Sequence, residues 1–333
     1  MLAYLGLGPA SAAALIVALA IHHFLVRPLA RNHHRLRKCS VLVTGADSGF
    51  GRTIALRLHA LGATVYAGVL SVEEGAKLRA EVGGSERMRP VRCDVTSAAE
   101  VEQVVREIAS GPPLWGLVNN AGIGAFGWCE ALPLSSYRAN TEVNYLGVVR
   151  LSRACLPLLR ESRGRIVNMG SYGALSPSAF GSAYLSTKAA VRCFSACLEQ
   201  EVFRFGVRVC YIEPGFFATR LVAGSCSAGG AESTAKIQGY PSFADKMATT
   251  AALIRLNEWM NGGVHGTEWV ADAAIDALCS HIPLSRYTCG WDALLLKYAG
   301  FWLPDALFVW GQTAMDCGIS GLLRVLAGGV AVP

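Results

Sequence analysis

Residues 44–51 read Thr44-Gly45-Ala46-Asp47-Ser48-Gly49-Phe50-Gly51 and lie between an apolar run, Ser40–Thr44, and a helical pattern, Gly51–Leu61. Glycines let a backbone turn tightly and approach a pyrophosphate, while the start of a helix offers free N–H groups and the positive end of its dipole. A glycine-rich turn in this position is far more specific than the same glycines in an arbitrary loop. The stretch therefore predicts a dinucleotide-binding turn, with G-x-x-x-G-x-G spacing, whose binding residues are Gly45, Asp47, Ser48, Gly49, Phe50 and Gly51.

The alternation of strand and helix continues along the chain. Further strands are predicted at Thr64–Gly68, Arg89–Asp94, Leu114–Asn119, Arg165–Gly170, Val207–Glu213 and Arg286–Cys289. Helices are predicted at Ala98–Ile108, Ala139–Leu159, Ser182–Phe205 and Val270–Cys279. This order is typical of an α/β fold with a doubly wound parallel sheet, so we expect one such domain over residues 40–292. It contains an irregular stretch, about 216–266, which we expect to be a substrate loop because long insertions are usually functional.

The N-terminal segment is apolar in a chain that is itself poor in charge. Of 333 residues, 16% are charged, against roughly 25% in soluble domains. Residues 2–21 carry no charged side chain, and twenty helical residues span roughly 30 Å, the thickness of a bilayer core. Cations follow at Arg27, Arg31, Arg35, Arg37 and Lys38, whereas a cleaved signal peptide has its charge first. We expect a transmembrane anchor at 1–26, a basic linker at 27–39 and a cytosolic domain.

Composition also limits the partners of this chain. The formal net charge is +6, but much of the excess lies in the linker rather than on the folded domain, so we expect no nucleic-acid partner. The eleven cysteines show neither zinc spacing nor a disulfide framework, which favours a reducing compartment and no metal site. Residues 293–333 form an apolar tail that could be core, a dimer surface or a membrane-interface contact.

Two further segments suit the cofactor cleft. Asp94 ends a predicted strand, where its carboxylate can bond near an adenine, and Asn119-Asn120-Ala121-Gly122 ends another at the edge where such sheets bind ligands. An acid at the end of the second strand would favour NAD, and an arginine would favour NADP. The chain has Gly68-Val69-Leu70 there. Without a cation for the 2′-phosphate, the sequence predicts NAD, with NADP left open.

Tyr184 and Lys188 lie four residues apart on a predicted helix and so share one face. A free tyrosine has a pKa near ~10, and an adjacent ammonium favours the phenolate, so we expect a lowered pKa and general acid–base chemistry. Ser171 follows a strand and can either hold a substrate oxygen or cap a turn. Asn144 is a poor helix former inside a predicted helix, which indicates a distortion, a water site or an exposed side chain.

Taken together, these motifs resemble the short-chain dehydrogenase/reductase family over roughly residues 41–291. The resemblance implies a Rossmann-type fold and hydride transfer to the nicotinamide C4. It implies Tyr184 as acid/base, Lys188 as its partner and a ribose ligand, Ser171 orienting the substrate oxygen and Asn144 holding a relay water. Pro214-Gly215 and Thr219 match the segment that grips the nicotinamide carboxamide, and Asn120 belongs to the strand-end motif.

One branch of the family is most similar. Asp47–Gly51, Leu114–Leu117 and Ile212–Gly215 resemble membrane-bound retinol dehydrogenases, oxidative 17β- and 11β-hydroxysteroid dehydrogenases and mitochondrial 3-hydroxybutyrate dehydrogenase. The branch implies a lipophilic alcohol, a steroid or retinoid, as substrate, an endoplasmic reticulum membrane and a homodimer. Arg220, a cation near Thr219, keeps 3-hydroxybutyrate as an alternative substrate. A mitochondrial membrane is the alternative location. A non-catalytic dinucleotide-binding redox sensor is a second class, against which the intact Tyr184, Lys188 and Ser171 argue.

Overall fold

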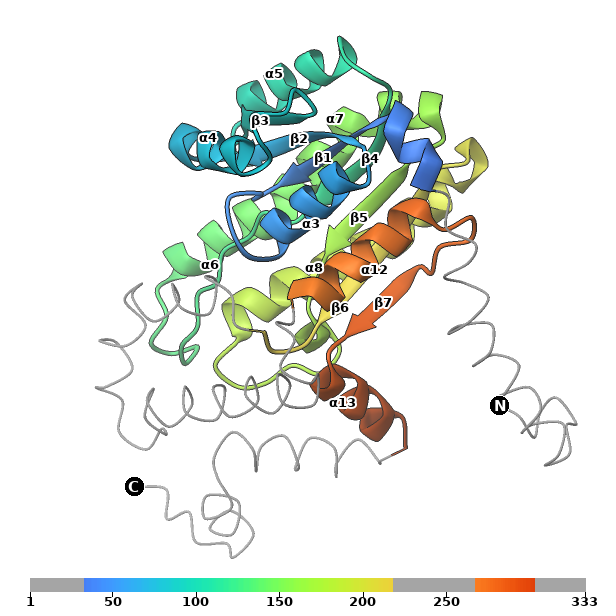
Figure 1. The fold of residues 1–333 in the computed structure, drawn as a ribbon. Helices are drawn as coiled ribbons and strands as arrows, with labels where there is room; N and C mark the ends of the chain where they lie inside the picture. Colours follow the sequence, from blue (N-terminus) through green and yellow to red (C-terminus); the bar gives the residue numbers. More distant parts are fainter. Residues whose placement is uncertain (1–32, 218–266, 303–333) are drawn as a thin grey trace, which may run out of the picture.

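The computed structural model describes residues 33–217 and 267–302 (Figure 1). The predicted anchor, most of the predicted substrate loop with Thr219 and Arg220, and residues 303–333 of the apolar tail lie outside the described residues. No helix in the described ranges is long and apolar enough to cross a membrane. The uncharged stretch 2–21 is not among them.

Seven parallel strands form one sheet in the order β3-β2-β1-β4-β5-β6-β7. All five residues of β1 are buried, as expected of a parallel strand covered on both faces. The predicted fold class is confirmed, and each predicted strand is present within two residues at either end. The strands are β1 Ser40–Thr44, β2 Thr64–Val69, β3 Met88–Arg92, β4 Leu114–Asn119, β5 Arg165–Met169, β6 Arg208–Pro214 and β7 Arg286–Cys289.

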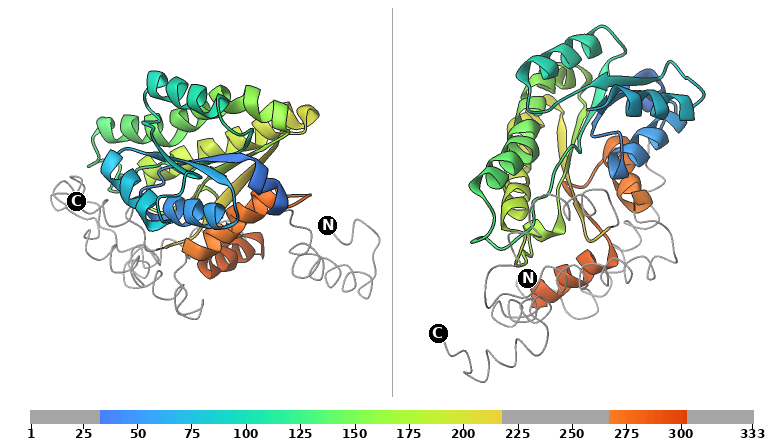
Figure 2. Two further views of the ribbon diagram at one scale, coloured as in Figure 1. Left: turned by 45° about the horizontal axis from the view of Figure 1, so that its top comes forward. Right: turned by 90° about the vertical axis from the view of Figure 1, so that its left-hand side faces the viewer.

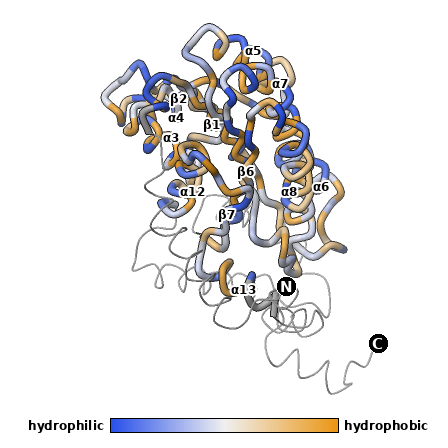
Figure 3. Tube along the Cα trace, turned by 90° about the vertical axis from the view of Figure 1, so that its right-hand side faces the viewer, coloured by the Kyte–Doolittle hydropathy of each residue, from blue (hydrophilic) through white to orange (hydrophobic). Residues whose placement is uncertain are grey.

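Helices cover both faces of the sheet, which gives three layers (Figure 2). One apolar core joins the sheet to α3, α4 and α12, and a second joins it to α5, α7 and α8. In α5, for example, Val101, Val104 and Ile108 are buried at helical spacing. Figure 3 shows the corresponding mixture of hydrophobic and hydrophilic residues along these helices. The α-helices are α3 Gly49–Ala60, α4 Val72–Glu81, α5 Ala98–Ala109, α6 Leu134–Thr141, α7 Gly147–Ser162, α8 Ser182–Val202, α12 Thr267–Cys279 and α13 Trp291–Trp302.

Helix α4 is an element that the sequence analysis missed. Ser71 caps it by accepting a hydrogen bond from the Glu74 backbone N–H at 3.3 Å. The order Ser-x-x-Glu is the capping-box pattern, so a local signal was present. The helix matters for function because its first turns lie beside the glycine-rich turn.

The end of the predicted basic linker packs against the domain. Residues His33–Lys38 form a 3-10 helix, η3, whose Leu36 is fully buried. The Arg35 guanidinium lies 4.0 Å from the centre of the Trp115 ring, and the Arg165 guanidinium lies 4.8 Å from it. The chain therefore joins the domain at the amino edge of the sheet, opposite the edge that carries the predicted site.

Candidate active site

The glycine-rich turn lies where the strand order reverses. The chain leaves β1 toward β2 on one side, while β4 pairs with β1 on the other, which creates a crevice at the carboxyl edge. Gly45 and Gly49 have φ of 62° and 52°, a left-handed conformation that favours glycine. The turn predicted from sequence is thus formed at the place where doubly wound sheets bind ligands.

Gly51 and Asn120 hold the turn in this shape. A Cβ on Gly51 would lie 2.1 Å from the Gly45 carbonyl oxygen and 2.4 Å from Asn120 Nδ2. Asn120 Nδ2 donates to the carbonyl oxygens of Thr44 at 2.9 Å and Gly45 at 3.2 Å. The Asn120 side chain, which was predicted to bind cofactor, therefore contacts the protein's own turn, and its amide supports that turn from β4.

The space beside the turn fits a dinucleotide. Helix α3 starts after Ser48, whose side chain makes no capping hydrogen bond, so the first N–H groups are not satisfied from that side chain. An open cavity of about 350 Å³ adjoins this helix start, and it is lined by Asp47, Ser48, Gly49, Arg52, Glu74, Lys77 and Leu78. An anionic pyrophosphate at the helix start and a ribose in the cavity match this arrangement.

The cavity contains two cations that the sequence analysis did not consider. Arg52 pairs with Glu81, and Lys77 Nζ lies 2.6 Å from Glu74 Oε1. Both come from helices rather than from the strand end where an arginine was sought. Because each cation is paired with a carboxylate and Asp47 also lines the cavity, its lining carries both positive and negative charge.

Asp94 lies just beyond β3 and closes a local turn. Its Oδ1 accepts hydrogen bonds from the Thr96 backbone N–H at 2.9 Å and the Thr96 hydroxyl at 2.7 Å. These bonds hold the pKa of the Asp94 carboxyl below its usual value. The carboxylate therefore stays ionised beside the predicted adenine end of the cleft.

Tyr184, Ser171 and Lys188 meet at the same edge of the sheet. The Ser171 side chain lies close enough to the Tyr184 phenol to lower its pKa as a hydrogen-bond partner. Lys188 Nζ lies 5.5 Å from the centre of the Tyr184 ring and donates to the Met169 carbonyl oxygen at 2.9 Å. Ser171 Oγ also accepts from the Gly173 backbone N–H at 3.2 Å. The serine therefore caps a turn, as the simpler interpretation held, and also contacts the tyrosine.

The pKa values at this triad differ from the sequence-based expectation. Burial raises the pKa of Tyr184, and the hydrogen bond from Ser171 only partly offsets this. Lys188 is not among the causes that act on the pKa of Tyr184, so the expected lowering is absent. The Lys188 ammonium lies 5.5 Å from the centre of the Tyr184 ring and donates its hydrogen bond to Met169. Burial also lowers the pKa of Lys188 to about 8. At neutral pH the site therefore holds a protonated phenol beside a buried ammonium.

Asn144 lies in the distortion that its residue type indicated. The predicted single helix 139–159 is instead α6 and α7 joined by a π-helical turn, Glu142–Leu146. Asn144 is fully buried, exchanging two hydrogen bonds of 2.9 Å with the backbone of Ile123. A Cβ on Gly122 would lie 3.2 Å from Asn144 Oδ1 and 3.7 Å from Lys188 Nζ. The glycine therefore brings the strand-end motif against both side chains.

The segment that follows β6 also lies at the carboxyl edge of the sheet. Pro214 ends the strand, and the Phe217 ring packs edge-on against Phe50 of the glycine-rich turn, with centroids 5.7 Å apart. Phe216 donates its backbone N–H to Asp292 Oδ2 at 2.7 Å. Sequence reasoning missed Asp292, which lies 76 residues further along the chain. Its only local signal was a carboxylate in the first turn of a helix.

Replacing Lys188 by methionine is expected to stabilise the protein. Burial lowers the pKa of Lys188 from 10.5 to about 8, which corresponds to a cost on the order of 3 kcal/mol when the group is charged in both states. This cost is complete below pH 8, and it declines as pH rises toward 10.5, because the folded lysine has lost its proton and the unfolded one has not. Lys188→Met should therefore melt at a higher temperature than wild type at pH 7, with a smaller gap at pH 10.

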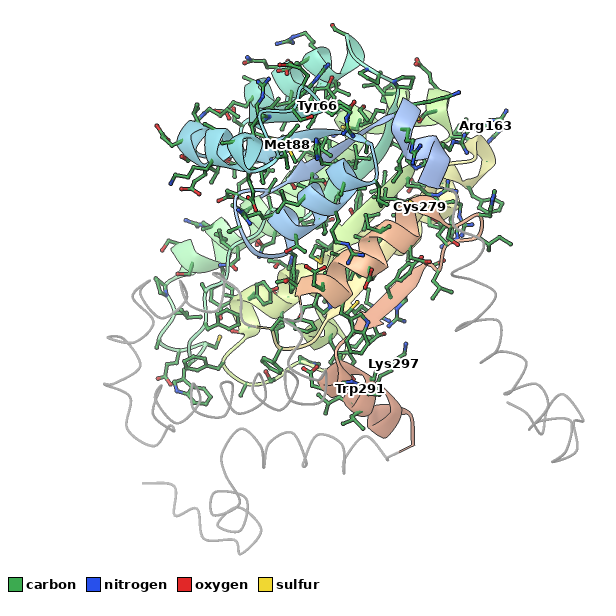
Figure 4. All side chains as sticks on the ribbon, viewed as in Figure 1. Tyr66, Met88, Arg163, Cys279, Trp291 and Lys297 are labelled. Atoms are coloured by element: carbon green, nitrogen blue, oxygen red, sulfur yellow. The ribbon has the colours of Figure 1, made fainter. Side chains whose placement is uncertain are left out.

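The matched control for this measurement is Lys297→Met, since Lys297 is an exposed lysine on α13 (Figure 4). It should leave the melting temperature nearly unchanged at both pH values. An equal or lower melting temperature for Lys188→Met at pH 7 would contradict the assigned burial cost. The lost hydrogen bond to Met169 makes the expected gain smaller than the full cost.

Comparison with known proteins supports the geometry. The family model for short chain dehydrogenases matches residues 39–228. The chain is 36% identical over 265 residues to rat mitochondrial D-beta-hydroxybutyrate dehydrogenase, covering 74% of this chain and 76% of that protein. It is 35% identical over 288 residues to mouse retinol dehydrogenase 16, covering 81% and 87%.

A third relative, rat estradiol 17-beta-dehydrogenase 2, is 44% identical over 187 residues, which is 55% of this chain. The match spans about half, 49%, of that protein's length. Among solved structures, a short-chain dehydrogenase from Streptomyces avermitilis is similar with a TM-score of 0.63 and 28% identity, covering 87% of this chain and 97% of that chain.

These matches and the crevice geometry lead to the same assignment. The turn, the strand-end motif and the Ser171, Tyr184 and Lys188 cluster lie within the matched range 39–228. This chain therefore belongs to the short chain dehydrogenase family, the NAD(P)-dependent oxidoreductases that act on CH–OH groups.

Proposed function

We propose that this protein transfers a hydride between NAD and a lipophilic alcohol or ketone, with a steroid or retinoid as substrate. The observation that carries the proposal is the contact between the Ser171 and Tyr184 hydroxyls beside the Lys188 ammonium, at the carboxyl edge of the sheet. A redox sensor without turnover does not need a phenol paired with a serine hydroxyl.

Each side chain has a distinct role in the proposed reaction. The nicotinamide, when bound, supplies the hydride acceptor or donor. Ser171 Oγ holds the substrate oxygen, and the Tyr184 hydroxyl gives a proton to that oxygen in reduction or takes one from it in oxidation. Lys188, whose ammonium lies 5.5 Å from the centre of the Tyr184 ring, binds the cofactor ribose. Asn144 holds the backbone at Ile123, which fixes the floor of the site and places a relay water.

The remaining predicted residues hold the cofactor. The turn residues Gly45, Asp47, Ser48, Gly49, Phe50 and Gly51 receive the pyrophosphate and ribose, and Asp94 bonds near the adenine. Asn120 supports the turn, while Pro214, Gly215 and Thr219 hold the nicotinamide end. NAD is favoured because Asp47 and Glu74 line the cavity and its two cations, Arg52 and Lys77, are already paired with carboxylates. A 2′-phosphate would have to break one of these pairs.

A lipophilic substrate is favoured by the relatives and by apolar side chains near the site. Retinol dehydrogenase 16 and estradiol 17-beta-dehydrogenase 2 are named for such alcohols. The Phe126 ring lies 5.2 Å from the Tyr184 ring, beside the proposed substrate oxygen. The second candidate is a small hydroxy acid, since D-beta-hydroxybutyrate dehydrogenase matches 74% of the chain and Arg220 follows the nicotinamide segment in sequence.

Membrane attachment and self-association complete the proposal. The uncharged residues 2–21 anchor the protein in the endoplasmic reticulum membrane, with the basic flank and the domain on the cytosolic side. A mitochondrial membrane is the alternative, and the protein acts as a homodimer. The anchor is tested by asking whether the full chain sediments with membranes after a carbonate wash. The comparison is a variant that lacks residues 1–32, which keeps the buried Leu36 of η3. A truncated protein that stays membrane-bound would place the attachment elsewhere.

The deciding experiment is a turnover panel. Membrane fractions that contain the full chain are assayed with NAD and NADP against steroid alcohols, retinol and 3-hydroxybutyrate, with Tyr184→Phe membranes as the blank. We expect turnover of a steroid or retinol with a higher kcat/KM for NAD than for NADP. Turnover of 3-hydroxybutyrate alone would establish the second candidate. Dinucleotide binding without turnover of any alcohol would establish a redox sensor.

A further inference from the structure

Asp292 is a buried carboxylate without a cationic partner among the described residues. It is 8% exposed, and Oδ1 has no hydrogen-bond partner in the described part of the chain. Burial raises the pKa of this carboxyl, although hydrogen bonds from backbone amides, with that of Phe216 the largest, oppose the rise. Burying an acid with so few partners is costly, so such a group is expected to serve a purpose beyond stability.

The carboxylate links two segments that are distant in sequence. Asp292 lies in the first turn of α13, which follows β7 through Gly290, where φ is 106° (Figure 1). Its Oδ2 accepts from the Phe216 backbone N–H at 2.7 Å. An acid at a helix start could simply complement the helix dipole. Here, however, the carboxylate reaches the exit of β6, which belongs to another segment of the chain.

Gly215 makes this contact possible. A Cβ on Gly215 would lie 2.2 Å from Asp292 Oδ1 and 2.3 Å from Oδ2, so only a glycine leaves room for the carboxylate. The Gly215 backbone N–H also donates to the Cys289 carbonyl oxygen at 2.8 Å. Residues 215 and 216 are therefore tied to the β7–α13 connection through one backbone bond and one side-chain bond.

The same segment reaches the glycine-rich turn. Phe217, the next residue, is 5% exposed and packs against Phe50 with ring centroids 5.7 Å apart. Burial raises the pKa of Tyr172, the neighbour of Ser171 in sequence, and the Asp292 carboxylate adds a smaller contribution to that rise. The segment that Asp292 holds at Phe216 therefore leads directly to the contact between Phe217 and the glycine-rich turn.

We propose that Asp292 is a positioning residue for the cofactor, which it serves by fixing the Gly215–Phe217 backbone and thereby the Phe217–Phe50 contact. It does not touch the reacting atoms. The inference rests on the proposed dinucleotide site, and it makes the first turn of α13 a part of that site. Without the carboxylate the Phe216 amide loses its hydrogen bond, and the Gly215–Phe217 segment is no longer held in place. Cofactor binding then has to order this segment, and the entropy lost in doing so weakens the binding.

The test compares Asp292→Ala and Asp292→Asn in the full-length protein, with Asp276→Ala as the control. Asparagine keeps an acceptor for the Phe216 amide, whereas alanine removes it. Asp276 is a buried carboxylate on the neighbouring helix α12 that accepts from the Tyr287 hydroxyl at 2.8 Å, so its removal also destabilises the fold. Two readouts are independent of turnover: the Kd for NADH from fluorescence, and hydrogen exchange of the peptide that contains Phe216.

We expect Asp292→Ala to raise the Kd for NADH at least tenfold and to speed exchange at Phe216. In Asp292→Asn the Kd for NADH and the exchange rate at Phe216 should both stay near the wild-type values. Asp276→Ala should lower the melting temperature without changing the Kd. An unchanged Kd and unchanged exchange in Asp292→Ala, or equal Kd changes in Asp292→Ala and Asp276→Ala, would overturn the positioning role and leave the proposed function intact. Wild type that binds neither dinucleotide would overturn both.

Discussion

Tyr184→Phe is expected to abolish turnover and to leave dinucleotide binding intact. The substitution removes one oxygen atom, the phenol oxygen on which Ser171 acts, and keeps the ring, whose centroid lies 5.2 Å from that of the Phe126 ring. Phenylalanine cannot exchange a proton with the substrate oxygen, and general acid–base catalysis of this kind contributes about 10²–10⁴-fold in rate. The expected result is a fall in kcat of at least that size, with the Kd for NADH unchanged.

A second tyrosine provides the control. Tyr66 is fully buried in β2, and its hydroxyl accepts a hydrogen bond from Arg89 at 3.1 Å, far from the serine turn. Tyr66→Phe also removes a buried hydroxyl, so it reports the loss of stability without any loss of acid–base chemistry. If Tyr184→Phe retained wild-type kcat, the acid/base role would be wrong, and Lys188 or a water would have to move the proton.

The features that the sequence predicted well depend on local patterns. The strand Ser40–Thr44, the glycine-rich turn and the helix after it are adjacent in sequence, and each has its own periodicity or turn signal. Tyr184 and Lys188 share a helix face because of their spacing alone. Even the distortion at Asn144 had a local cause, the poor helix propensity of asparagine. The doubly wound fold then follows from the order of the elements.

The features that the sequence did not reveal depend on tertiary contacts. The pKa of Tyr184 is raised by burial, which no spacing of residues on one helix can reveal. The Asn120 side chain contacts the carbonyl oxygens of Thr44 and Gly45 only because β4 pairs with β1. Asp292 meets Phe216 because β6 and β7 are neighbours in the sheet. The cations Arg52 and Lys77 face one cavity from two different helices.

Gly51→Ala is the second substitution with a large expected effect. Gly51 lies in α3, so alanine suits its backbone, and the whole effect is steric. The new Cβ would lie 2.1 Å from the Gly45 carbonyl oxygen and 2.4 Å from Asn120 Nδ2. Neither atom can move freely, because the Asn120 amide is bonded to the carbonyl oxygens of Thr44 and Gly45. The turn must open, which costs typically about 1–3 kcal/mol of stability and removes the surface that receives the pyrophosphate.

Thermal unfolding measures the loss of stability, and NADH titration measures the loss of cofactor binding. Gly83→Ala is the control for both measurements. A Cβ on Gly83 meets nothing within 4 Å, but its φ is 67°, so alanine there costs roughly 1–2 kcal/mol through backbone strain alone. Both variants should unfold at lower temperature than wild type, yet only Gly51→Ala should lose NADH binding, with a Kd raised by a factor of a hundred or more. Equal affinities for NADH in the two variants would mean that the glycine-rich turn does not receive the cofactor.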